Sequence, residues 1–126
     1  MHKVEKKDIG LVPAVLYWLL TLGYMGLIFY LSSRHNIPLP KLPINFDKVI
    51  HMCAYIPLAY LFYLSLKTSG INKYVFVLAV ICASIYGIMD ELHQFFVPGR
   101  DADVFDFAAD ALGAFLGSIA ARITIA

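Results

Sequence analysis

Residues 11–31 read LVPAVLYWLLTLGYMGLIFYL, an apolar run without a charged side chain. About 20 apolar residues in a helix are enough to cross a hydrocarbon core of about 30 Å, so this run predicts a transmembrane helix. Lys3, Lys6 and Lys7 precede it like the basic end of a signal peptide. The run is too long for that role and no small-residue cleavage site follows, so we expect it to be retained.

Three further apolar stretches of similar length follow, at about 49–66, 74–95 and 104–125. Of the 126 residues, 60% are apolar and 15% are charged, whereas soluble domains carry about 25% charged residues. The sequence therefore predicts an all-α, polytopic membrane protein, a compact bundle of four transmembrane helices that forms one domain over residues 1–126. The four spans leave no room for a separate soluble catalytic domain.

The basic residues predict the orientation in the membrane, because cytoplasmic loops carry an excess of Lys and Arg. The tail before the first span, the second loop and the C-terminal end hold six: Lys3, Lys6, Lys7, Lys67, Lys73 and Arg122. The first and third loops with their flanks hold four: Arg34, Lys41, Lys48 and Arg100. We expect a multi-pass protein of the cytoplasmic membrane with both termini in the cytoplasm. The net charge of +1 gives no reason to expect a nucleic-acid partner.

Polar residues gather at the end of the bundle that carries the first and third loops. They are Ser32, Ser33, Arg34, Asp47, Lys48, His51, Asp90, Glu91, His93, Gln94, Arg100, Asp103, Asp106 and Asp110. Residues three or four apart share a helix face, so Asp106 and Asp110 continue into the small residues Gly113, Gly117 and Ala121. Small residues at this spacing let helices approach closely. We therefore expect both carboxylates to point into the bundle, with Arg34, Lys48 or Arg100 as partners.

The sequence resembles the VanZ-like family, small bacterial membrane proteins named for one associated with resistance to glycopeptides, especially teicoplanin. The resemblance covers about residues 27–120. It is carried by Tyr86-Gly87-x-x-Asp90-Glu91-x-His93-Gln94, Phe96-x-Pro98-Gly99-Arg100, Asp106, Gly113-x-x-x-Gly117, Asp47-Lys48-x-x-His51 and Tyr55. Asp103 and Asp110 depart from the family pattern, which has small residues or Asn at these positions, and the extra acid favours a cation or a basic head group as ligand.

The candidate site residues come from this resemblance together with the polar cluster. Candidate catalytic residues are Glu91, His93, Asp106 and His51. Candidate binding residues are Arg100, Asp90, Gln94, Asp47, Lys48, Ser32 and Asp110. Histidine and carboxylates spread over three helices could also bind a divalent metal. An H-x-x-x-H or H-E-x-x-H motif is lacking, however, so the sequence predicts neither a metal site nor a cofactor.

Several functions stay open at this point. The resemblance implies envelope protection or glycopeptide resistance, through an outward-facing polar site that binds an amphiphilic drug or a lipid-linked head group. The alternatives are a membrane-embedded enzyme acting on a lipid-linked phosphate, held by Arg100, and a small proton-coupled transporter, which would need an oligomer. A fourth interpretation is an interfacial charge network that only sets helix register.

The predicted orientation can be tested by cysteine labelling in a variant that lacks Cys53 and Cys82. A membrane-impermeant thiol reagent added to intact cells should label Lys41→Cys, in the first loop. It should leave Ser69→Cys, in the second loop, unlabelled until the membrane is permeabilised. Labelling of Ser69→Cys from outside would reverse the orientation.

Overall fold

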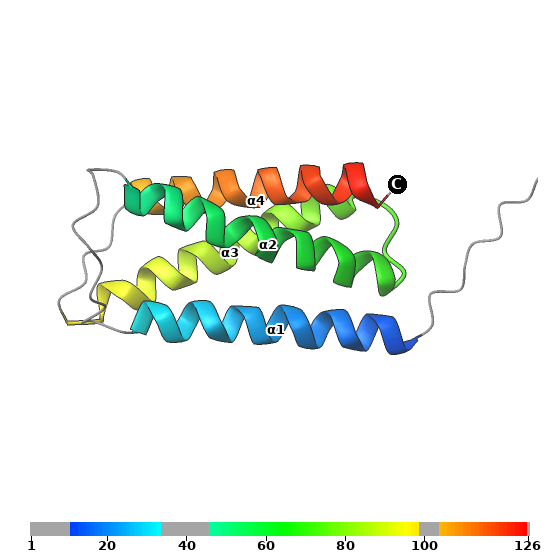
Figure 1. Ribbon diagram of the computed structural model, residues 1–126, viewed down its shortest axis with the longest axis horizontal. Coiled ribbons are helices and arrows are strands. Elements are labelled where there is room, and N and C mark those ends of the chain that lie inside the picture. The colour runs from blue at the N-terminus through cyan, green and yellow to red at the C-terminus, as the bar shows by residue number, and fades with distance from the viewer. Residues whose placement is uncertain (1–10, 34–45, 99–103, 126) are drawn as a thin grey trace, which may run out of the picture.

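The computed structural model describes residues 11–33, 46–98 and 104–125, which form four helices (Figure 1). They are α1 (Leu11–Ser33), α2 (Phe46–Thr68), α3 (Val75–Phe95) and α4 (Val104–Thr124). Each is long and apolar enough to cross a membrane. The predicted four-span, all-α fold is confirmed. The helix starts differ most from the prediction at α2, which begins at Phe46, three residues before the predicted position 49.

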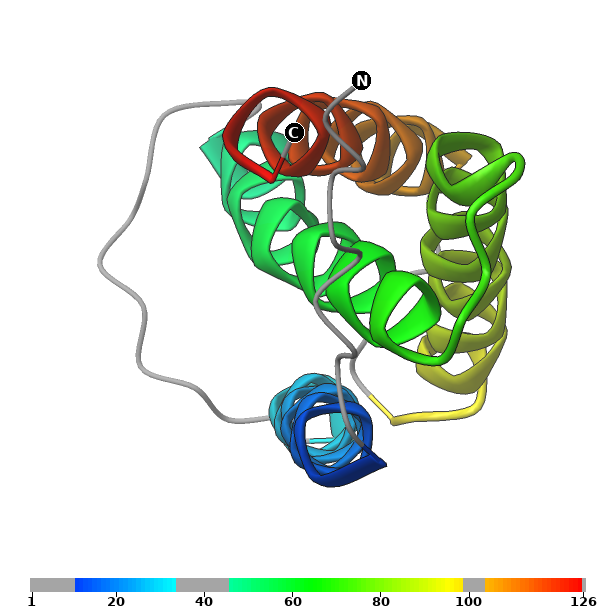
Figure 2. The same ribbon diagram turned by 90° about the vertical axis from the view of Figure 1, so that its right-hand side faces the viewer.

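Helix α2 is the central element of the bundle. It lies between α1 and α4, with α3 alongside (Figure 2), and its most extensive contacts are with α4. Among the described residues α1 contacts α2 and α3 but not α4. Large apolar side chains remain exposed along α1, for example Leu19 and Leu22, which are the surfaces that a bilayer would cover.

Two glycines of α4 set the distance between α4 and α2. A Cβ atom added at Gly113 would collide with the backbone carbonyl of Met52, and one added at Gly117 would collide with that of Ile56. Both contacts are with backbone, which side-chain rotation cannot relieve. The predicted packing face of α4 is confirmed, since Gly113, Gly117 and Ala121 are all buried against the bundle.

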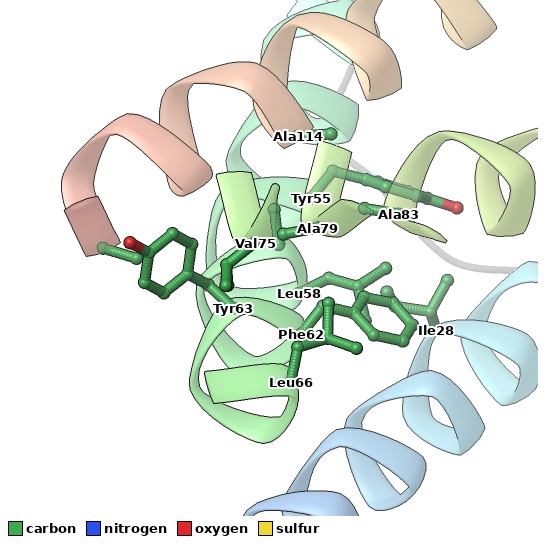
Figure 3. Packing of buried hydrophobic residues seen from close by; sticks show 12 residues of the cluster. Ile28, Tyr55, Leu58, Phe62, Tyr63, Leu66, Val75, Ala79, Ala83 and Ala114 are labelled. Carbon is green, nitrogen blue, oxygen red and sulfur yellow. The ribbon is translucent and has the colours of Figure 1, made fainter. Parts of the chain in front are cut away.

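The apolar core fills the middle of the bundle (Figure 3). Tyr55 of α2 lies with Ala83 of α3 and Ala114 of α4, where small residues leave room for its ring. Ile28 of α1 packs on the same core from the other side of α2. The large side chains of the core therefore come mainly from α2, and its neighbours supply small ones.

The turn between α2 and α3 holds these helices antiparallel. Gly70 has a φ of 92°, a left-handed conformation that favours glycine. Its N–H bonds to the carbonyl of Lys67, and the N–H of Ile71 bonds to that of Leu66, both at 3.1 Å. This pair of bonds is the Schellman arrangement that ends a helix.

Because α2 and α4 are in backbone contact, adding a single methyl group at this contact should lower the free energy of unfolding. Gly117→Ala should lower the free energy of unfolding by about 1–3 kcal/mol, the usual cost of overpacking. Gly23→Ala is the matched control, because an added Cβ there meets nothing within 4 Å. Thermal unfolding in detergent should show a lower midpoint for Gly117→Ala alone. Equal midpoints for the two variants would mean that the helices are not in contact at Gly117.

Candidate functional site

The polar ends of all four helices meet at one end of the bundle, on the left in Figure 1. Four carboxylates are buried there: Asp90 is 4% exposed, Glu91 8%, Asp106 6% and Asp110 0%. We call these four residues together with His51 the polar centre. Asp110 lies six residues into α4, about 9 Å from the start of the helix at 1.5 Å per residue.

His51 connects the carboxylates of the polar centre. Its Nδ1 lies 2.9 Å from Asp110 Oδ1 and 3.8 Å from Glu91 Oε1. Its Nε2 lies 3.8 Å from Asp106 Oδ2. An ionised carboxylate only accepts hydrogen bonds, so the Nδ1–H donates to Asp110. The imidazole is therefore hydrogen-bonded to Asp110 through Nδ1, and its Nε2 faces Asp106 without a hydrogen bond.

Lys48 lies at the rim of the polar centre, one turn before His51 in α2. Its Nζ donates to Asp106 Oδ1 at 3.0 Å. The Lys48 side chain is 24% exposed and that of His51 17%, more than those of the carboxylates that they contact. The prediction that a basic residue would pair with the inward-facing acids is confirmed for Lys48. These two basic side chains are the parts of the site nearest to its surface.

Asp90 joins the polar centre to α1 through weaker contacts. The Tyr55 hydroxyl and the Gln94 amide donate to Asp90 Oδ2, both at 3.4 Å. The Gln94 amide also donates to the Ser32 hydroxyl of α1 at 3.3 Å. Asp90 Oδ1 is buried and has no hydrogen-bond partner among the described residues.

His93 faces α1. Its Nε2 lies 2.8 Å from the Ser33 hydroxyl, and its ring stacks on Phe29 with centroids 4.2 Å apart. Two turns earlier on the same side of α3, the Tyr86 hydroxyl donates to the Met25 carbonyl of α1. His93 therefore links α3 to α1, and of the two histidines that the structure describes, His51 is the one that contacts the carboxylates.

Gly87 leaves space for Asp110 beside α3. A Cβ atom at Gly87 would lie 3.1 Å from Asp110 Cβ, 3.3 Å from Asp110 Oδ2 and 3.4 Å from the Tyr55 ring. Asp110 Oδ2 is buried and has no hydrogen-bond partner among the described residues. The glycine thus lets a fully buried carboxylate lie against the helix that carries Asp90 and Glu91, one turn further along.

The structure brings together eight of the predicted site residues in or beside the polar centre. They are Ser32, Lys48, His51, Asp90, Glu91, Gln94, Asp106 and Asp110. Arg100 and the side chain of Asp47 lie outside the described residues, as do Arg34 and Asp103. Tyr55 and Gly87 were in the quoted motifs but were not assigned to the site. Helical spacing could have assigned them, because Tyr55 lies one turn from His51 and Gly87 lies one turn from Glu91.

The arrangement is suited to holding positive charge. His51, Glu91 and Asp110 each offer a ligand atom, and these atoms lie within 4.8 Å of one another. Carboxylates inside a membrane span are costly, by about 2.5–3.5 kcal/mol for Asp at the centre of a helix on insertion scales. They are usually retained at sites that bind ions or polar ligands or that transfer protons.

Comparison with known proteins gives one family. The sequence model of the VanZ/LLP1 family matches residues 9–125, nearly the whole chain. Neither curated proteins nor solved structures give a match.

The two histidines of this end should differ in their effect on stability. His51→Ala leaves Asp110 fully buried without its close partner, which should cost about 3–5 kcal/mol. His93→Ala removes one partly buried hydrogen bond and a ring contact, and should cost about 1 kcal/mol. Denaturant unfolding of both variants in the same detergent measures the difference. A cost for His93→Ala as large as that for His51→Ala would contradict the assignment of His51 as the partner of the buried acid.

Proposed function

The chain belongs to the VanZ/LLP1 family, and from this we propose that it protects the bacterial cell envelope against glycopeptides such as teicoplanin, through its polar centre. The observation that carries the proposal is the burial of four carboxylates within membrane spans. Lys48 and His51 are the described basic side chains that contact them. Such a concentration of acid is expensive in a membrane, and a fold that needed only helix packing would not require it.

We place the polar centre at the outward side of the cytoplasmic membrane. The excess of basic residues in the second loop and near both termini supports this orientation. The helix ends bearing the polar centre lie opposite the α2–α3 turn and the end of α4 (Figure 1). A site at this level would meet drugs and lipid-linked head groups in the outer leaflet.

The charges of the site define the ligand class. The carboxylates would bind a cationic group of an amphiphile, and Lys48 at the rim would contact an anionic one. Arg100, assigned to the site by the family resemblance, would hold an anionic head group through two parallel hydrogen bonds. A ligand with both charges in one head group fits this order, with its anion near the surface and its cation deeper.

The contacts of His51 favour binding over catalysis. Both ring nitrogens face carboxylates, at 2.9 Å and 3.8 Å, so the ring is held in place by protein groups. A general base needs a nitrogen directed to the substrate proton. The alternative of a membrane-embedded enzyme would require His51 Nε2 to turn from Asp106 Oδ2, 3.8 Å away, toward the substrate.

The proposal is tested by expressing the chain in a teicoplanin-sensitive Gram-positive host. The intact chain should raise the minimum inhibitory concentration of teicoplanin several-fold over an empty vector. Glu91→Gln should abolish this protection at unchanged membrane abundance, because it removes a charge from the polar centre without changing side-chain size. Ile88→Ala, on the exposed face of the same helix, should keep it.

Abundance measured by immunoblot of membranes separates loss of function from loss of protein. Full protection by Glu91→Gln at normal abundance would contradict a functional role of the polar centre. Protection lost equally in Ile88→Ala would indicate a general defect of α3.

A further inference from the structure

We propose that His51, Glu91 and Asp110 bind a divalent transition-metal ion, and that Zn²⁺ is the best chemical match. The three side chains come from α2, α3 and α4 and offer one nitrogen and two oxygens within 4.8 Å of one another. The sequence predicted no metal because it contains no H-x-x-x-H or H-E-x-x-H motif. Here each helix supplies one ligand, so a local motif does not exist.

The distances are close to those of a tetrahedral site. Bonds of about 2.0–2.2 Å from Zn²⁺ to nitrogen and oxygen place neighbouring ligand atoms roughly 3.3–3.6 Å apart. His51 Nδ1 lies 2.9 Å from Asp110 Oδ1 and 3.8 Å from Glu91 Oε1, on either side of that value. The third pair, Glu91 and Asp110, lies within 4.8 Å. Side-chain rotations that shorten this distance would bring all three atoms onto one ion.

A buried oxygen of Asp110 without a hydrogen-bond partner also points to a bound cation. This side chain is completely buried, and its Oδ2 has no hydrogen-bond partner among the described residues. It lies on the side facing α3, where the missing side chain of Gly87 leaves it room. Buried polar atoms of native proteins nearly always have a partner, and a cation between α3 and α4 would supply one. Asp90 Oδ1, also buried and without a partner, lies on the same helix one turn after Gly87.

Asp106 would orient the histidine ligand. Histidines that bind metals usually donate their other ring N–H to a carboxylate, which fixes the tautomer. When His51 Nδ1 binds the ion, its proton moves to Nε2 if the ring is neutral, or to solvent if both nitrogens are protonated. In either case Nε2 carries the one ring proton that is left. Nε2 already lies 3.8 Å from Asp106 Oδ2, and Asp106 is itself held by Lys48 at 3.0 Å. The ligand and its supporting carboxylate are thus in place on two helices.

The ligand set favours zinc over the common hard cations. Mg²⁺ and Ca²⁺ prefer sites built from oxygen alone, whereas an imidazole nitrogen suits Zn²⁺ and its neighbours in the series. Three protein ligands leave a fourth position open, as in zinc sites that bind a further molecule. The inference deepens the proposed function by placing the ion where a cationic group of the ligand would otherwise lie. It rests on the proposed function for one step only, that the open position of the ion receives an anionic group of the envelope ligand. Metal binding itself can be measured without that step.

The experiment uses the full chain purified in detergent, with Cys53 and Cys82 replaced by Ser to exclude thiol binding. The protein is stripped with a chelator and titrated with Zn²⁺ against a fluorescent zinc indicator, with Mn²⁺ and Mg²⁺ as comparisons. We expect one Zn²⁺ per chain, weaker binding of Mn²⁺ and little binding of Mg²⁺. Stoichiometric zinc is then quantified by mass spectrometry after desalting.

The variants separate this site from zinc bound elsewhere. Asp106→Asn should weaken binding by about 10–100-fold, the usual effect of losing the partner of a ligand histidine. His51→Gln and Asp110→Asn should weaken it further. A control chain with His2, His35 and His93 all changed to Gln keeps the proposed ligands and should bind Zn²⁺ normally. X-ray absorption of the zinc-loaded chain with an unchanged polar centre should show nitrogen and oxygen ligands, including one imidazole. This measurement does not depend on whether the variants fold.

Absence of a stoichiometric zinc would overturn the inference, as would binding that survives His51→Gln but is lost in the three-histidine control. Teicoplanin protection is measured on the same variants. Protection without zinc binding would leave the proposed function standing and remove the metal. Zinc binding without any protection would leave the metal site and remove the proposed function.

Discussion

The close approach of α2 and α4 is the constraint on which the rest of the structure depends. Gly113 and Gly117 bring the backbone of α4 against the carbonyls of Met52 and Ile56. The two helices run in the same direction. One turn before Gly113 in α4 lies Asp110, and within one turn before Met52 in α2 lie His51 and Lys48. The glycine contacts thus fix the register in which the acids of α4 meet the basic residues of α2.

The other two helices complete this pair in different ways. Helix α3 brings Glu91 to His51 and leaves a gap at Gly87 for Asp110. Helix α1 is held to its neighbours by side-chain hydrogen bonds, such as the buried one of 2.8 Å between Thr21 and Ser65. Inside a bilayer lipid tails are as apolar as leucine, so polar contacts and close packing, rather than apolar burial, must hold helices together. The more buried α2, α3 and α4 carry the polar centre, and α1 closes one side of it.

Much of the fold and part of the site followed from the sequence. Span lengths are fixed by bilayer thickness, and helical periodicity placed Asp106, Asp110, Gly113 and Gly117 on one face. Contacts between helices could not be predicted in this way. Periodicity shows which residues share a helix face, but not which residue of the neighbouring helix each of them contacts. His93 and Glu91 are two residues apart, yet one meets Ser33 of α1 and the other His51 of α2. For the same reason the grouping of His51, Glu91 and Asp110 is visible only once three helices are packed.

We infer that the polar centre is kept for function at a cost in stability. Asp110 is its deepest member, and one of its oxygens lacks a hydrogen-bond partner among the described residues. Replacing it with Asn removes a buried charge, while the amide oxygen can still accept the bond from His51. The most direct measurement is teicoplanin protection together with the unfolding midpoint for Asp110→Asn. We expect protection to be lost while the unfolding midpoint stays the same or rises. A midpoint that falls together with protection would show that the carboxylate is part of the structural framework.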